Sequence, residues 1–196
     1  MIRLITCIII SQLLFVTLIP VWEELIEYLN ILVIAVAWLS ITTIGIIFGL
    51  LWSKKKINLS VTTVHVGMLF YTAGLIILLF FRPNGPGADN INVIPFETIK
   101  LYLSGNAEPL VALYNIGANI VLTIPLGIYY RLVAKKPSLL TLLLIAVLSI
   151  SIIEVSQLIL GRGSMDIDDL ILNTTGFIVG YLLTPLIQKT LHITRM

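Results

Sequence analysis

Charge is scarce in this chain of 196 residues. Only 11% of the residues are Asp, Glu, Lys or Arg, whereas soluble domains carry about 25%. The net charge of +2 is small and the basic residues are scattered, which argues against a nucleic-acid partner. Cysteine occurs once, as Cys7, so no disulfide can form within the chain. The remainder is rich in apolar residues, 58% of the chain, and the mean hydropathy of +1.06 indicates an integral membrane protein.

Six long apolar segments predict an all-α polytopic membrane protein with six transmembrane helices. They cover residues 4–21, 31–52, 61–81, 111–133, 138–160 and 170–188. About 20 helical residues cross a hydrocarbon core of ~30 Å. Unpaired backbone groups cannot face lipid, so isolated spans must be helical. We expect two parts, an N-terminal transmembrane pair over residues 1–60 and a membrane domain over residues 61–196.

The basic residues predict the orientation of these spans. With the N-terminus in the cytoplasm, nine of the twelve basic residues fall on the cytoplasmic side. They are Arg3, Lys54, Lys55, Lys56, Arg131, Lys135, Lys136, Lys189 and Arg195. Only Arg82, Lys100 and Arg162 then fall outside. Because Lys and Arg favour the inner side of a membrane, both termini are predicted to be cytoplasmic.

The long connection over residues 82–110 is then external. It opens with Arg-Pro-Asn-Gly-Pro-Gly, which ends the preceding helix and favours turns. Pro95 then begins a short helix that Gly105 ends. Phe96, Ile99 and Leu103 share one face of it, which predicts a helix lying in the outer membrane interface. A surface loop without any ligand is the alternative.

Polar side chains gather between residues 154 and 180. Ionisable groups at membrane depth cost about 2.5–3.5 kcal/mol each, so they indicate a functional site. The segment holds Glu154, Gln157, Arg162, Asp166, Asp168, Asp169 and Asn173. Asn115 and Asn119 lie at a similar depth in the segment 111–133. These nine residues predict an outward-facing polar pocket between the last three spans.

Other patterns limit what this pocket does. Gly127, Gly176 and Gly180 allow helices to approach closely, and Asn or Gln side chains serve as interhelical contacts in many membrane proteins. Asp168 or Asp169 could cap a helix N-terminus. The acidic run lacks the length and glycine of a calcium loop, so we expect no metal and no cofactor. No complete catalytic signature is found either.

Three motifs in chain order resemble the VanZ-like family, named for a protein associated with teicoplanin resistance in Gram-positive bacteria. The resemblance covers about residues 82–183. The motif residues are Asn92, Pro95, Phe96, Ile99, Asn115, Asn119, Pro125, Gly127, Glu154, Gln157, Arg162, Asp166, Asp168, Asp169, Asn173, Gly176 and Gly180. The resemblance implies a multi-pass plasma-membrane protein with an outer-surface role in glycopeptide resistance or envelope stress, and brings no established reaction.

Two functions follow as hypotheses. In the first, the pocket binds an amphiphile, a lipid-linked wall precursor or a lipoglycopeptide, with Arg162 meeting a phosphate or carboxylate. In the second, the chain is an intramembrane enzyme that acts on a lipid-linked substrate through Glu154 and the cluster Asp166, Asp168 and Asp169. The missing signature favours the first. A transporter is disfavoured, because the last three spans carry few polar residues in their cytoplasmic halves.

Overall fold

The computed structural model describes residues 2–20, 22–23, 32–53, 56–80, 91–105 and 107–194. Within them, four helices are long and apolar enough to cross a membrane, and the chain is mainly helical. They are Val61–Phe80, Val111–Val133, Leu139–Ile159 and Ile167–Ile187. Two shorter apolar stretches, Ile2–Thr17 and Ile41–Ser53 within the helix Leu32–Ser53, belong to the first two predicted spans. Six spans with cytoplasmic termini therefore stay a prediction.

Some residues used in the prediction lie outside the described ranges. They are Lys54, Lys55, Arg195 and the Arg-Pro-Asn-Gly-Pro-Gly stretch from Arg82. The chain divides into two compact units, Met1–Pro83 with Pro185–Met196, and Asn84–Thr184. The predicted division at residue 60 stays a prediction.

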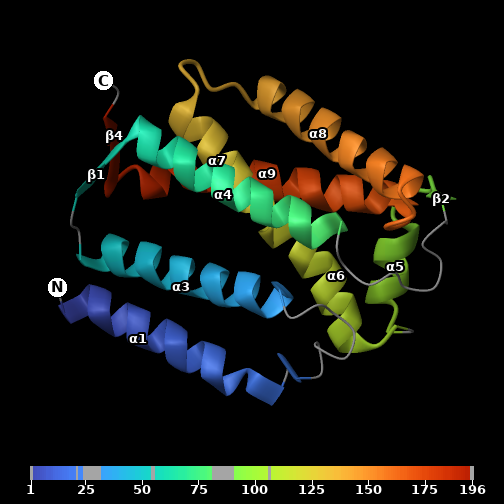
Figure 1. Ribbon diagram of the computed structural model, residues 1–196, viewed down its shortest axis with the longest axis horizontal. Coiled ribbons are helices and arrows are strands. Elements are labelled where there is room, and N and C mark those ends of the chain that lie inside the picture. Colours follow the sequence, from blue (N-terminus) through green and yellow to red (C-terminus); the bar gives the residue numbers. More distant parts are fainter. Residues whose placement is uncertain are drawn as a thin grey trace. The chain divides into compact units, whose positions relative to one another are not determined.

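In the first unit, helix α1 (Ile2–Thr17) packs along helix α3 (Leu32–Ser53), as Figure 1 shows. Polar side chains join the two helices: Trp38 Nε1 donates to Gln12 Oε1 at 2.7 Å, and Gln12 Nε2 donates to Thr42 Oγ1 at 2.9 Å. Interhelical hydrogen bonds of this kind suit an apolar surrounding, where the alternative is an unsatisfied polar group. Gln12 thus links the two helices through both ends of its amide group.

The same unit contains a short parallel pair of strands. Strand β1 (Ile57–Ser60) pairs with strand β4 (Leu191–Thr194), so that Ile57 lies opposite Leu191. Helix α4 (Val61–Phe80) follows β1 directly. Ser60 Oγ accepts a hydrogen bond from the backbone N–H of Thr63 at 3.0 Å, which caps the first turn of α4.

The second unit contains the predicted pocket residues. In chain order its elements are β2 (Ile91–Asn92), α5 (Glu97–Leu103), α6 (Pro109–Val121), α7 (Ile124–Val133), α8 (Leu139–Ile159), β3 (Met165–Asp166) and α9 (Ile167–Ile187), whose last turn passes into the first unit. Its core joins α8 to α9 through Leu142, Ala146, Ile150 and Phe177. In Figure 1, α5 and β2 lie at one end of this unit and the α7–α8 loop at the other.

The predicted span over residues 111–133 contains a break. Helix α6 ends at Val121 and α7 begins at Ile124, with Pro125 in its first turn. Proline has no N–H, so the carbonyl of Val121 loses its usual donor four residues later. Pro125 therefore explains why one apolar segment forms two helices.

Three glycines let α9 touch the α6–α7 region backbone to backbone. A Cβ at Gly176 would overlap Thr123 Oγ1 and the Ile120 carbonyl, and one at Gly180 would overlap the Ile124 carbonyl. A Cβ at Gly127 would overlap the Phe177 carbonyl of α9. No side chain fits between helices this close. The contacts at these three glycines therefore fix the positions of α6 and α7 along the length of α9.

Candidate functional site

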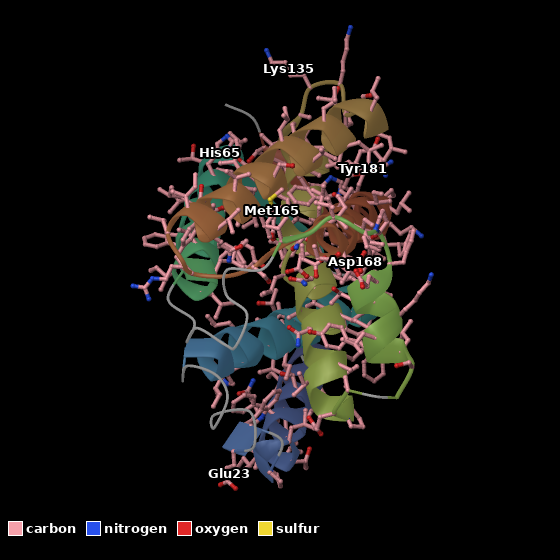
Figure 2. All side chains as sticks on the ribbon, turned by 90° about the vertical axis from the view of Figure 1, so that its right-hand side faces the viewer. Glu23, His65, Lys135, Met165, Asp168 and Tyr181 are labelled. Carbon is pink, nitrogen blue, oxygen red and sulfur yellow. The ribbon has the colours of Figure 1, made fainter. Side chains whose placement is uncertain are left out.

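Asp168 lies at the centre of the polar cluster and is fully buried, with 0% of its surface exposed. Its Oδ1 accepts the backbone N–H of Phe96 at 2.5 Å, and its Oδ2 accepts that of Ile99 at 3.0 Å. These N–H groups belong to the start of α5, where a helix lacks internal partners. Asp168 therefore caps α5 from a distance of about 70 residues in sequence. Figure 2 shows its oxygens beside α5.

This cap coincides with an unusual backbone conformation. Phe96 has φ 67° and ψ 10°, in the left-handed region that costs a non-glycine residue about 1–2 kcal/mol. It follows Pro95 in the turn before α5, and its side chain is exposed. The two hydrogen bonds that the Asp168 carboxylate accepts offset that cost. At the other end of α5, Gly105 has φ 76°, a conformation that glycine adopts freely.

Asp166 ties the strand before α5 to the strand before α9. Strands β2 and β3 pair in parallel, which places Asn92 opposite Asp166. Asn92 Nδ2 donates to Asp166 Oδ1 at 3.1 Å, and the backbone N–H of Asp168 donates to the same oxygen at 2.8 Å. Thr98 Oγ1 donates to Asp166 Oδ2 at 2.6 Å. Both oxygens of this buried carboxylate are thus occupied within the protein.

Thr98 was missed by the sequence reasoning, although it lies among the motif residues. Its hydroxyl also accepts from Asn92 Nδ2 at 3.0 Å, so it closes a ring with Asp166. Threonine in the first turn of a predicted helix is a weak signal by itself. Thr98 and its partner Asp166 lie 68 positions apart in the chain.

Glu154 and Gln157 reach the cluster from the end of α8 and are 6% and 3% exposed. Glu154 Oε2 accepts the backbone N–H of Asp166 at 3.2 Å. The carbonyl of Gln157 accepts the backbone N–H of Arg162 at 2.8 Å and closes the turn after the helix. Gly161 in that turn has φ 60°. The end of α8 thus positions β3.

The remaining predicted residues line the contact between α6 and α9. Asn119 Nδ2 donates to Asp169 Oδ1 at 2.6 Å, which joins the two helices. Asn115 and Asn173 instead donate to carbonyls on their own helices, those of Val111 and Asp169. One step deeper, Thr123 Oγ1 donates to the carbonyl of Asn173 at 2.7 Å. This set holds α6 against α9.

Arg162 differs from the other predicted residues because its side chain is exposed. Nothing described in the structure pairs its guanidinium with an acid, and only its backbone N–H bonds into the cluster. We call Glu154, Asp166, Asp168 and Asp169 together the carboxylate end of the unit. Its acids bind donors of the chain itself, while Arg162 and the exposed Lys100 face outward as cations.

The chemistry of the carboxylate end is that of a scaffold. A carboxylate that accepts two or three hydrogen bonds from fixed donors is held in place and is a poor metal ligand unless those bonds break. Among the described residues, no group of three His, Cys, Asp or Glu side chains is placed to hold a metal ion. What this end presents is the segment 91–105, with Val93, Ile94, Phe96, Leu101 and Leu103 all more than half exposed.

The fold and this site define a helical membrane protein with a buried acidic scaffold. A family model for VanZ/LLP1 matches residues 68–188, and the chain belongs to that family. The match begins inside α4 and includes every predicted site residue. Comparisons with curated proteins and with solved structures each found no match.

Proposed function

We propose that this chain is a non-enzymatic plasma-membrane protein that binds an amphiphile at its carboxylate end. The amphiphile is a lipid-linked wall precursor or a lipoglycopeptide outside the membrane. Binding would contribute to teicoplanin resistance or envelope stress tolerance, in keeping with the family.

One observation carries the proposal. The buried carboxylates hold a surface segment that exposes apolar side chains, and exposed basic side chains lie at the same end of the unit. Residues 91–105 supply the apolar part, and Lys100 and Arg162 supply positive charge. An amphiphile offers the matching combination of acyl chain and anionic head. A short amphipathic helix with such exposed residues also suits the membrane interface.

Arg162 would meet the anionic head, because guanidinium groups bind phosphate and carboxylate in a bidentate way. Hydrogen bonds to charged groups contribute about 1.5–3 kcal/mol, so the loss of this contact weakens binding about tenfold or more. The test is the protection that the chain gives growing cells against teicoplanin. Arg162→Ala should abolish most of it while the protein still reaches the membrane.

Lys189→Ala is the matched control, since it removes one exposed positive charge outside the site. It should leave protection unchanged. Unchanged protection in Arg162→Ala at equal expression would overturn the proposal.

The burial of Glu154 favours a second candidate, an intramembrane enzyme. A buried carboxyl group can serve as a general acid. Glu154→Gln distinguishes the two functions, because the amide oxygen can still accept the N–H of Asp166 but the group no longer transfers a proton. An enzyme loses turnover of a lipid-linked substrate, whereas a binding protein keeps its protection.

A further inference from the structure

The loop between α7 and α8, residues 134–138, is held by two tyrosine hydroxyls. Tyr130 Oη accepts the backbone N–H of Ser138 at 3.1 Å and lies 3.2 Å from the carbonyl of the same residue. Tyr181 Oη donates to the carbonyl of Pro137 at 3.3 Å. A five-residue loop fixed at its end from two different helices keeps one conformation. We call Tyr130, Arg131, Tyr181 and this loop the tyrosine end.

Arg131 helps to hold the loop in place by contacting Tyr181. Its Nη1 donates to the carbonyl of Tyr181 at 2.7 Å, and its guanidinium lies 4.2 Å from the centre of the Tyr181 ring. That carbonyl needs a donor, because Pro185 stands four residues later and has no N–H. Arg131 thus fixes Tyr181, and Tyr181 fixes the loop.

Lys135 and Lys136 stand exposed in the middle of the held loop, and Figure 2 shows Lys135 pointing outward. The sequence contains no Asp or Glu between residues 109 and 153. Two lysines and no acid therefore give the loop a purely positive surface. Its tyrosine rings match the belt of amphipathic aromatic residues found at the level of lipid headgroups.

The length of α8 places this loop at a membrane surface. Its 21 residues rise about 30 Å, the thickness of a hydrocarbon core, between the loop and the carboxylate end. The charge asymmetry predicts that the loop faces the cytoplasmic leaflet, where anionic lipids attract Lys and Arg.

We propose that the tyrosine end is a binding site for anionic phospholipid headgroups. Lys135 and Lys136 bind the phosphate and any second negative group, and the tyrosine-held backbone keeps the two ammonium groups at headgroup level. This site differs from the proposed amphiphile site in its residues, in its ligand and in its side of the membrane.

The experiment uses the purified full chain in phosphatidylcholine vesicles and measures its association with spin-labelled phosphatidylglycerol relative to spin-labelled phosphatidylcholine. Each lysine near an anionic surface strengthens attraction about fivefold. The double substitution Lys135→Ala with Lys136→Ala should lower the preference for phosphatidylglycerol by about twenty-fivefold. Lys135→Arg with Lys136→Arg, which keeps both charges, should retain it.

Two further variants separate a built site from general charge. Lys189→Ala removes an exposed charge outside both proposed sites and should leave the preference unchanged. Tyr130→Phe removes the hydroxyl that holds Ser138 and no charge, and it should lower the preference. The proposal is overturned if the double alanine variant binds like the wild type, if Lys189→Ala weakens binding equally, or if Tyr130→Phe has no effect. Displacement of the lipid by inorganic phosphate would identify a free-phosphate site instead.

Discussion

At the carboxylate end, Asp168 accepts hydrogen bonds from two backbone N–H groups at the start of α5, whereas at the tyrosine end Arg131 donates to the backbone carbonyl of Tyr181. Both charges satisfy backbone groups that regular helix geometry leaves without a partner. In an apolar surrounding such groups cost about 1–3 kcal/mol each when unsatisfied. Asp168 and Arg131 therefore form hydrogen bonds with backbone groups of the protein itself. Only the charged side chains that are exposed are available to bind a ligand.

The two ends differ in how many groups depend on the charge. Asp168 is fully buried and accepts hydrogen bonds from two backbone N–H groups. The neighbouring carboxylate of Asp166 accepts hydrogen bonds from three donors. Arg131 donates a hydrogen bond to one backbone carbonyl and is half-buried. The carboxylate end should accordingly be the more sensitive to substitution.

The largest effect is expected for Asp168→Ala, which leaves the N–H groups of Phe96 and Ile99 without acceptors. We expect a loss of about 4 kcal/mol in the free energy of unfolding, measured in detergent. Asp168→Asn keeps one acceptor and should cost about half as much. The control Glu97→Ala removes an exposed acid from α5, the helix that Asp168 caps, and should change stability by less than about 0.5 kcal/mol. Equal losses in Asp168→Ala and Glu97→Ala would contradict the comparison.

Gly176→Ala tests the crossing that lies between the two ends. Its Cβ would overlap the Ile120 carbonyl, so α6 must move away from α9 at a cost of about 3 kcal/mol. Gly117→Ala is the matched control, because a Cβ there meets nothing within 4 Å. That variant should gain up to about 1 kcal/mol from helix propensity. Thermal unfolding of both variants measures the difference, and a harmless Gly176→Ala would show that the helices are not in backbone contact.

A smaller effect, about 2 kcal/mol, is expected for Arg131→Ala, because the carbonyl of Tyr181 loses its donor. Pro185→Ala supplies a backbone N–H four residues after Tyr181 and should reduce that loss. A double-mutant cycle on unfolding free energies measures the coupling, which we expect to be about 1 kcal/mol. Strict additivity of the two substitutions would refute the role given to Arg131.

The smallest effect concerns the left-handed residue before α5. Phe96→Gly should stabilise the protein by about 1 kcal/mol, because glycine adopts φ 67° without strain. Leu103→Gly, at the exposed last residue of α5, should instead cost up to about 1 kcal/mol. The opposite signs distinguish backbone strain from the general effect of glycine, and the same unfolding assay reads both.

Hydropathy alone located the helices well where the chain is uniformly apolar. The segments 61–81 and 138–160 correspond closely to α4 (Val61–Phe80) and α8 (Leu139–Ile159). The start of α9 was placed at residue 170, yet the helix begins at Ile167 and includes two aspartates. Acidic residues lower hydropathy even where a helix N-terminus favours them, so the pattern set the boundary too late.

The candidate site could be predicted as a set of residues but not as a set of contacts. The sequence grouped Asp166 and Asp168 with seven other residues in one predicted polar pocket. That Asp168 binds the backbone of Phe96 could not be read from the sequence, because a backbone N–H is the same in every residue except proline. Thr98 and Arg131 were missed as contact residues because their partners lie 68 and 50 positions away in the chain.

The most direct test of the central claim is the dissociation constant of teicoplanin for the purified full chain in phosphatidylcholine vesicles. We claim that the acids hold the site and that the exposed cation binds the ligand. Arg162→Ala should therefore weaken binding about tenfold or more, while Glu154→Gln, which keeps an acceptor for Asp166, should bind as tightly as the wild type. Unchanged binding in Arg162→Ala together with lost binding in Glu154→Gln would contradict the account.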